Sequence, residues 1–443
     1  MTLRLLLALL SLVVAATGCM STKTLPYAST LPPGSVTPTP APAAVSVQLS
    51  AASPCLIGST QTGFSIPDVI PQTLAALPLD ANNNLILGAG APAVTVTSGT
   101  PNALAVATSP AGANYFTLTG NPQNFTTTPV TLTVAIAKPA PSASPSAAPI
   151  SLTVPVTLTQ TLLAAGPTTV SAYAPASGTQ CWTQTVASSA VAAADPVGNL
   201  YVANGANVTM YAPGTTKTVT TGPVTGTITA LAADAKQNVY IGTPGIAYKF
   251  GNGGTVALLR YTPPFQSAVA DIAVDANGNV FLSNGYPTTG NSIVEFPSGS
   301  TNSSRTLGGN LQVMGLLADK NGNLFELDGV AWVVNEYLPG ATTPIFTTGT
   351  LPNQPYSFAL DANGGLYVDA ASTMFVDAAG ATTPTSSFPT NFVLQHGIAV
   401  DRNGLIYVLD NGGTVSVYSS AGTLLSHIAG GAALQGGSIW IRP

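Results

Sequence analysis

The feature that most constrains this chain is a short motif that recurs six times in its second half. Each copy has an Asp, a turn rich in Asn and Gly, and then a strand-like run with an aromatic residue. The copies begin at Asp195, Asp234, Asp275, Asp319, Asp361 and Asp401. The successive Asp residues lie 39, 41, 44, 42 and 40 residues apart. A chain with this period builds its core by packing like units against one another.

Each repeat also carries the pattern of several short antiparallel strands. In the third repeat, apolar runs at 272–274, 280–282 and 293–296 surround the Asp and its turn. A period near 40 with about four strands per unit is typical of propeller blades. We therefore predict an all-β chain with a six-bladed β-propeller over residues 165–443. Segments 169–175 and 181–186 have the pattern of the back half of a blade and 437–441 that of a front strand, so a seventh, composite blade is an open alternative.

The motif resembles the NHL repeat, which also occurs in the senescence-marker/gluconolactonase superfamily. The resemblance covers roughly residues 185–430 and implies a propeller. In enzymes of the gluconolactonase group, acidic and Asn side chains hold a divalent ion in the central channel. The positions nine residues after each Asp could provide such ligands here, and oxygen donors suit Ca²⁺. Four of these six positions carry such a side chain, and we treat them as candidate metal ligands: Asn204, Asn284, Asp328 and Asp410.

The repeated Asp residues themselves are better explained as turn formers than as a catalytic array. Asx side chains bond to nearby backbone groups, and the Gly that follows accepts a positive φ. Six equivalent positions would also be spread around a ring. The period-locked aromatics should be core residues: Tyr201, Tyr240, Phe281, Phe325, Tyr367 and Tyr407. Trp182, Trp332 and Trp440 break the repeat, and one of them on a rim could contact a glycan or a protein.

No catalytic residues are predicted. The chain has two His residues, His396 and His427, and neither has a partner at metal-ligand spacing. No Gly-x-Ser-x-Gly nucleophile elbow occurs, and the Gly-rich segments 252–254 and 308–309 lack the Lys-Ser/Thr of a phosphate loop. Enzymatic activity is therefore uncertain, and binding without catalysis is the leading interpretation.

The N-terminus has the pattern of a secretory signal. A short positive segment, 1–4, precedes an apolar run at 5–16 that is too short to span a bilayer. Ala16-Thr17-Gly18-Cys19 then resembles the lipobox of bacterial lipoproteins, in which cleavage precedes a Cys that is diacylated. The resemblance implies a signal peptide over 1–18, lipidation of Cys19 and anchoring at a membrane surface of the bacterial cell envelope.

Between this signal and the repeats, two further regions are expected. Residues 19–44 are rich in Pro, Thr and Ser and read as an extended tether. Residues 45–160 contain alternating runs typical of half-buried antiparallel strands, which favours a β-sandwich. The runs lie at 45–49, 94–97, 115–119, 130–134 and 150–158, and residues 79–98 resemble bacterial Ig-like domains. The Pro/Ala/Ser-rich stretch 138–149 is either a hairpin loop inside this domain or a linker after it.

Two cysteines are left if Cys19 is lipidated. Cys55 and Cys181 would then lie in an oxidising compartment, where a disulfide could join the N-terminal domain to the start of the propeller. Two separate buried thiols are the alternative.

Charge limits the class of partner. Lys, Arg, Asp and Glu make up only 6 % of the chain, the net charge is −5, and no run of Lys or Arg occurs. Nucleic-acid binding needs basic clusters, so it is not expected. The leading hypothesis is a lipid-anchored binding or scaffold protein with a protein or glycan ligand and no cofactor. The alternatives are a lactonase-type hydrolase that uses Ca²⁺ or another divalent cation, and a structural envelope protein.

Overall fold

The computed structural model describes residues 44–87, 91–136, 150–175, 177–187, 191–265, 267–284, 292–308, 312–378, 380–381, 383–390 and 395–441. The expected signal peptide, Cys19 and nearly all of the tether lie outside these residues. The described chain is built from strands, with two short 3-10 helices, η1 (Pro122–Asn124) and η2 (Gly431–Ala433). None of its helices has the length and apolar character needed to cross a bilayer.

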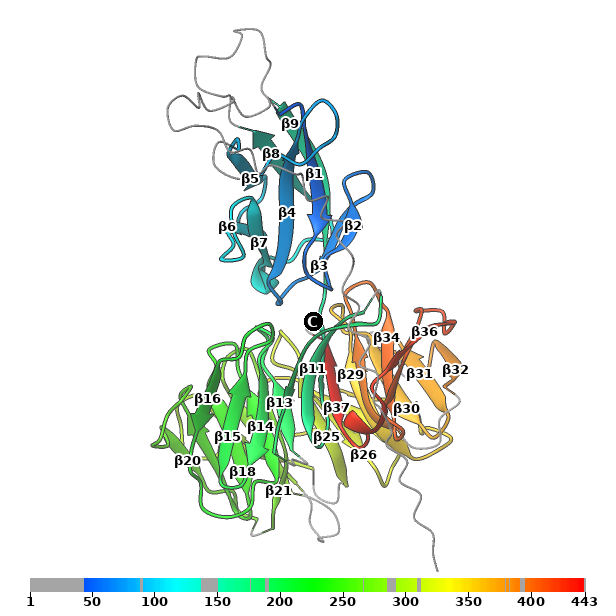
Figure 1. Ribbon diagram of the computed structural model, residues 1–443. Helices are drawn as coiled ribbons and strands as arrows, with labels where there is room; N and C mark the ends of the chain where they lie inside the picture. The colour runs from blue at the N-terminus through cyan, green and yellow to red at the C-terminus, as the bar shows by residue number, and fades with distance from the viewer. Residues whose placement is uncertain are drawn as a thin grey trace, which may run out of the picture. The chain divides into compact units, whose positions relative to one another are not determined.

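The first nine strands form two sheets (Figure 1). One sheet has the order β1 (Ser46–Ala51), β4 (Gln72–Leu79), β7 (Tyr115–Gly120) and β6 (Leu104–Thr108). The other has the order β2 (Ile57–Ser59), β3 (Gly63–Pro67), β9 (Ile150–Thr159), β8 (Val130–Ile136) and β5 (Val94–Ser98). β8 and β9 pair antiparallel, with Ile136 opposite Ile150, so the stretch 138–149 connects two strands of one sheet and is not a linker after the domain.

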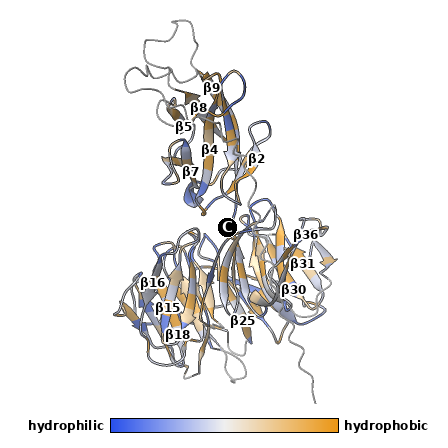
Figure 2. Cartoon of the chain, in the orientation of Figure 1, coloured by the Kyte–Doolittle hydropathy of each residue, from blue (hydrophilic) through white to orange (hydrophobic). Residues whose placement is uncertain are grey.

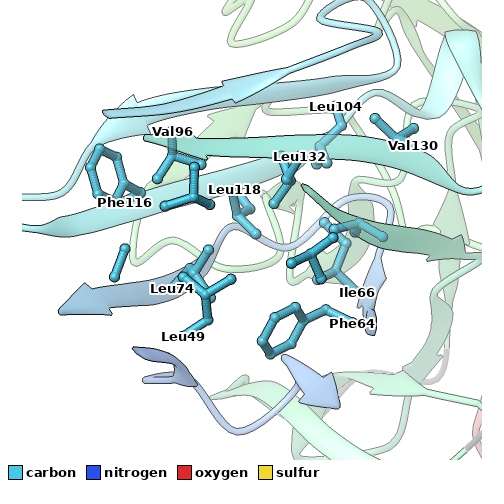
Figure 3. Close-up of a cluster of buried hydrophobic side chains, with 14 of the residues drawn as sticks. Leu49, Phe64, Ile66, Leu74, Val96, Leu104, Phe116, Leu118, Val130 and Leu132 are labelled. Carbon is cyan, nitrogen blue, oxygen red and sulfur yellow. The ribbon is translucent and has the colours of Figure 1, made fainter. Parts of the chain in front are cut away.

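Alternate residues of both sheets point into one shared core, which makes this domain a β-sandwich. Leu74 and Leu118 come from the first sheet, Ile66 and Leu132 from the second, and all are buried in one cluster (Figure 3). The alternation of Val94–Ser98 and Val130–Ile136 between buried and more exposed positions is the period-two pattern of the sequence.

The remaining strands form seven four-stranded sheets in the described chain, as a β-propeller does. Six of them are built from consecutive strands. Sheets 1 to 3 are β13 (Ala192–Ala194), β14 (Leu200–Asn204), β15 (Asn207–Tyr211), β16 (Thr218–Thr221); β17 (Ala230–Ala233), β18 (Val239–Thr243), β19 (Ile246–Phe250), β20 (Leu259–Tyr261); and β21 (Val269–Val274), β22 (Val280–Asn284), β23 (Ile293–Phe296), β24 (Arg305–Leu307). Sheets 4 to 6 are β25 (Val313–Ala318), β26 (Leu324–Asp328), β27 (Val333–Tyr337), β28 (Phe346–Thr347); β29 (Pro355–Leu360), β30 (Leu366–Ala370), β31 (Thr373–Asp377), β32 (Ser386–Pro389); and β33 (Gln395–Val400), β34 (Ile406–Asp410), β35 (Thr414–Tyr418), β36 (Leu424–Ala429). Figure 2 shows apolar residues along strands such as β30 and β31, which lie in the interior of sheet 5.

Sheet 7 is composite and joins the two ends of the propeller sequence. From its first strand to its fourth, its order is β37 (Ser438–Ile441), β10 (Leu162–Ala165), β11 (Thr169–Ala174) and β12 (Thr179–Thr185). The described propeller thus has the composite seventh sheet that the sequence offered as an alternative, and not only the six regular blades that were predicted first. The second strand of this sheet was missed, and it moves the start of the propeller from 165 to Leu162. The first strands of sheets 1 to 7 contact one another in order, and β10 contacts β14 of sheet 1, so the ring is closed.

Candidate functional site

The repeated Asp closes the turn between the first and second strands of its sheet. In sheet 1, Asp195 Oδ1 accepts the backbone N–H groups of Val197 and Asn199, at 3.0 and 2.9 Å. Its Oδ2 accepts Asn199 Nδ2 at 2.7 Å and the Tyr201 hydroxyl at 2.9 Å. Burial raises the pKa of Asp195, against the opposing effect of these hydrogen bonds. The carboxylate is thus fully engaged inside its own sheet.

The same turn recurs in all six consecutive sheets. Each repeat Asp accepts the N–H groups of the residues two and four positions later through Oδ1. The residue three positions later takes a positive φ, for example 98° at Gly198, and in sheet 2 Gln237 adopts it at 62°. These hydrogen bonds support the turn interpretation of the six Asp residues.

The aromatic residues of the second strands are buried, as expected for core. Tyr201, Tyr240 and Tyr407 are fully buried, and each donates its hydroxyl to the repeat Asp of its own sheet. Burial, followed by the nearby Asp charge, raises the pKa of each of these hydroxyls. These side chains lie in the packing between sheets and are not available to a ligand.

The four candidate metal ligands lie at the ends of second strands in four different sheets. Asn284 Oδ1 accepts the Ser292 N–H at 2.7 Å, Asp328 Oδ1 accepts the Val330 N–H at 2.8 Å, and Asp410 Oδ1 accepts the Thr414 N–H at 2.8 Å. Asn204 ends β14 and is exposed. The structure thus gives three of these side chains local roles in their own hairpins. In the part of the chain that the structure describes, no three His, Cys, Asp or Glu side chains are grouped to hold a metal ion.

A cavity of about 330 Å³ lies among the first strands of sheets 4 to 7, and we call it the channel cavity. Its walls are apolar and come from the ends of β25, β29, β33 and β37. They include Leu317, Phe358, Leu360, Ile398 and Trp440. Trp440 is therefore the one Trp of the three considered from the sequence that lines this cavity. The other lining residues were missed because they occupy ordinary first-strand positions of the repeat.

The polar rim of the channel cavity comes from the repeat turns of sheets 4 and 5. Asp319 and Asp361 are engaged in their turns, and Lys320 Nζ donates to the Ala362 carbonyl at 3.1 Å. Lys320 thereby links the two turns. Asn321 and Asn363 also line the cavity. An apolar pocket with a few polar groups at its edge is the usual form of a ligand site.

The other two Trp residues, Trp182 and Trp332, pack against the hydrophobic core of the propeller. Trp182 Nε1 donates to the Thr215 carbonyl at 2.8 Å, and its ring packs partly buried beside sheet 1. Trp332 lies in the turn between β26 and β27 with φ of 56° and packs against the core between sheets 4 and 5. Of the two His residues, His427 is exposed and its Nδ1 lies 2.9 Å from Ser416 Oγ.

Cys55 and Cys181 form a disulfide across a sequence separation of 126 residues. Cys181 belongs to β12 of sheet 7, and Cys55 lies in the sandwich. The bridge therefore links the sandwich covalently to the composite sheet. The alternative of two separate thiols does not hold in this structure.

Several carboxyl groups are buried at repeat positions where most other sheets have apolar residues, and sequence reasoning missed them. Glu326 is the third residue of β26, where the corresponding residues are Val202, Ile241, Leu282, Val368 and Val408. Burial raises the pKa of Glu326 to about 8. Aligning the six repeats position by position would have shown these exceptions.

Comparisons with known proteins add little beyond the fold. No protein-family model matches the chain, and no curated protein matches it. Among solved structures, a chain of the "Mitotic Checkpoint Complex" is 14 % identical with a TM-score of 0.47, and the match covers 54 % of this chain and 76 % of that one. The "WD40 beta propeller domain of Doa1" is 12 % identical with a TM-score of 0.44, covering 52 % of this chain and 79 % of that one. Matches at this level carry no information about function.

Proposed function

We propose that this chain is an exported, lipid-anchored binding protein whose propeller takes an apolar side chain of a protein partner into the channel cavity. The observation that carries the proposal is the composition of that cavity. Its walls are Leu, Ile, Phe, Val and Trp side chains, and its Asp carboxylates are already engaged in turns. Burial of an apolar group there would contribute about 25 cal/mol per Å². Because fold alone does not give function, the proposal rests on the site.

The apolar walls favour a protein ligand over a glycan. A sugar presents many hydroxyl groups, and these need hydrogen-bond partners when they are buried. At the cavity edge, such partners come from Asn321, Asn363 and the turn backbone. Trp440 could stack on either kind of ligand, but Leu317, Leu360 and Ile398 offer only apolar contact. We therefore assign a protein segment with a protruding apolar residue as the ligand class.

We also assign the propeller to the NHL group and the sandwich to the bacterial Ig-like domains. The recurrent Asp turn with an aromatic in the following strand supports the first assignment, and the two-sheet core supports the second. The sequence Ala16-Thr17-Gly18-Cys19 supports export and lipidation of Cys19. Metabolic labelling with a fatty acid should tag the wild-type chain and not Cys19→Ser. Equal labelling of both chains would contradict the anchor.

The binding proposal can be tested with peptides selected from a displayed library on the full chain. Selected peptides should contain an apolar residue whose replacement by Ala weakens binding. Leu360→Asp places a charge on the cavity wall and should weaken binding about tenfold or more, because a buried unpaired charge is costly. Val256→Asp is the matched control, since Val256 is 76 % exposed and outside the cavity. Peptides that bind Leu360→Asp and wild type equally would contradict the proposal.

A further inference from the structure

One repeat position breaks an otherwise regular rule of this propeller. The third strand of a sheet carries an aromatic residue opposite the first residue of the second strand. This holds for six of the seven sheets, with the pairs Tyr211–Leu200, Phe250–Val239, Phe296–Val280, Tyr337–Leu324, Tyr418–Ile406 and Tyr173–Leu162. In sheet 5 the corresponding residue, opposite Leu366, is Asp377.

The aromatic residues fill the space between neighbouring sheets. Phe296 of sheet 3 packs against Tyr261 in the fourth strand of sheet 2, with ring centroids 5.1 Å apart. Tyr418 of sheet 6 packs in the same way against Phe388 in the fourth strand of sheet 5, at 5.4 Å. Between sheets 4 and 5 the fourth strand still supplies Phe346, but its ring partner is replaced by a carboxylate.

A cavity of about 140 Å³ lies at this place, and we call it the intersheet cavity. Phe325 and Phe346 of sheet 4 and Leu366 of sheet 5 supply its apolar walls. Its polar walls are Asp319, Asn321, Asn323, Glu336, Asn363 and Asp377. None of the described residues that line it is a Lys, Arg or His; Lys320, in the same turn, lines the channel cavity instead.

The Asp377 carboxylate is buried and has no hydrogen-bond partner among the described groups. The residue is 1 % exposed, and no group of the described structure donates a hydrogen bond to either of its oxygens. Buried carboxylates are normally paired, because desolvation of an unpaired charge is costly. Asp319 and Glu336 add negative charge nearby; both accept hydrogen bonds from Asn323 Nδ2, at 3.1 and 3.0 Å. The described lining of the cavity therefore combines an unpaired carboxylate with two further acidic side chains and no basic one.

We propose that the intersheet cavity binds the cationic head group of a Lys or Arg side chain from a protein partner, with Asp377 as its counter-ion. A guanidinium or ammonium group donates hydrogen bonds to carboxylate and amide oxygens, and its alkyl stem packs on phenyl rings. The Phe walls do not suit a hard metal ion, which takes six or more oxygen ligands. One water needs about 10 to 15 Å³ of such cavity volume, so a cavity of about 140 Å³ has room for a head group of several atoms.

The titration of Asp377 is compatible with this role. Burial raises the pKa of its carboxyl to about 6, so the group is charged at neutral pH. The titratable groups that face it across the cavity are Asp319 and Glu336. Burial, followed by the Asp319 charge, raises the pKa of Glu336. A bound cation would favour the ionised forms of all three groups.

The test measures binding of N-acetyl-arginine methylamide and N-acetyl-lysine methylamide to the full chain by calorimetry at pH 7.5. At least one should bind, and the neutral citrulline analogue should not. Asp377→Asn keeps the shape of the side chain and should weaken binding about tenfold to a hundredfold, as for loss of a charged hydrogen-bond partner. Asp377→Phe restores the aromatic of the other sheets; it should abolish binding and raise the melting temperature.

Three results would overturn the proposal. The first is binding of neither cationic probe. The second is equal affinity of wild type and Asp377→Asn, which would place the binding elsewhere. The third is displacement of the bound probe by stoichiometric Ca²⁺ in wild type and not in Asp377→Asn, which would make the site a metal site. A peptide that occupies only the channel cavity would retain its affinity for Asp377→Asn, so this experiment is independent of the function proposed above.

Discussion

Replacement of Glu326 by Gln should remove a large part of the pH dependence of stability. Glu326 is fully buried in β26. Its Oε2 accepts Asn335 Nδ2 at 2.7 Å, and its Oε1 has no partner among the described groups. Burial raises its pKa from 4.5 to about 8. The folded chain therefore keeps this carboxyl protonated at neutral pH, whereas the unfolded chain ionises it.

The sign and size of the effect follow from proton linkage. Between pH 4.5 and about 8 the folded chain binds the extra proton, so its free energy of unfolding falls as the pH rises. The slope is at most about 1.4 kcal/mol per pH unit. Burial also raises the pKa values of Asp271 and Asp377, both to about 6, and these groups act with the same sign at lower pH. Over pH 6 to 8 the loss due to Glu326 is then about 2 kcal/mol, because the slope falls as the pH approaches the folded pKa.

The assay is urea denaturation followed by Trp fluorescence at intervals from pH 5 to 9. The wild-type free energy of unfolding should fall between pH 6 and 8, and that of Glu326→Gln should fall much less, with the small remaining slope due to Asp271 and Asp377 near pH 6. Asp80→Asn is a suitable control, because hydrogen bonds from the turn residue Asn84 lower the pKa of Asp80 below 3.8. The Asp80→Asn substitution can change the free energy of unfolding by a constant amount, but it should not change the pH dependence of that free energy above pH 6. Parallel curves for wild type and Glu326→Gln would refute the reasoning.

Three further predictions concern stability. Replacing both Cys55 and Cys181 by Ser should cost up to about 5 kcal/mol on the chain-entropy estimate for a separation of 126 residues, so reductant should lower the melting temperature of wild type and not of the variant. Asp401→Ala should lower the free energy of unfolding by about 2 to 4 kcal/mol in denaturant titrations, because two backbone N–H groups and the Tyr407 hydroxyl lose their acceptor. An unchanged denaturation midpoint would contradict this role of Asp401. Leu132→Ala opens a cavity in the sandwich core and should cost about 3 kcal/mol; a loss below 1 kcal/mol would show that this core is loosely packed.

The repeat made the propeller predictable from sequence. An Asp turn must be followed by a second strand, and a period near 40 leaves room for four strands per unit. The composite sheet was only an alternative, because β10 has four residues and no repeat motif, and its pairing with β37 joins segments far apart in the chain. The sandwich strands could be predicted where apolar and polar residues alternate along the strand, as in Val94–Ser98. β4 was missed because its apolar residues hide the alternation.

The candidate sites are formed by residues that depart from the repeat pattern, and such departures are harder to recognise in the sequence than the repeat itself. Trp440 could be noted because Trp is rare in this chain, but its neighbours in the channel cavity are common first-strand residues. Asp377 could have been found by aligning the third strands, where every other sheet has an aromatic residue at the matching position. In contrast, the Asp and Asn residues that attracted a metal interpretation lie at hairpin ends, where the same side chains bond to the backbone.

The most direct test of the central claim observes the channel cavity when a ligand is bound. In the double variant Trp182→Phe, Trp332→Phe, Trp440 is the only Trp, so its fluorescence reports on the cavity wall. A selected peptide should shift its emission to shorter wavelength and protect it from acrylamide quenching, with the same Kd that calorimetry gives. Saturating peptide that leaves both the emission and the quenching of Trp440 unchanged would show that the ligand binds elsewhere and would contradict the proposed function.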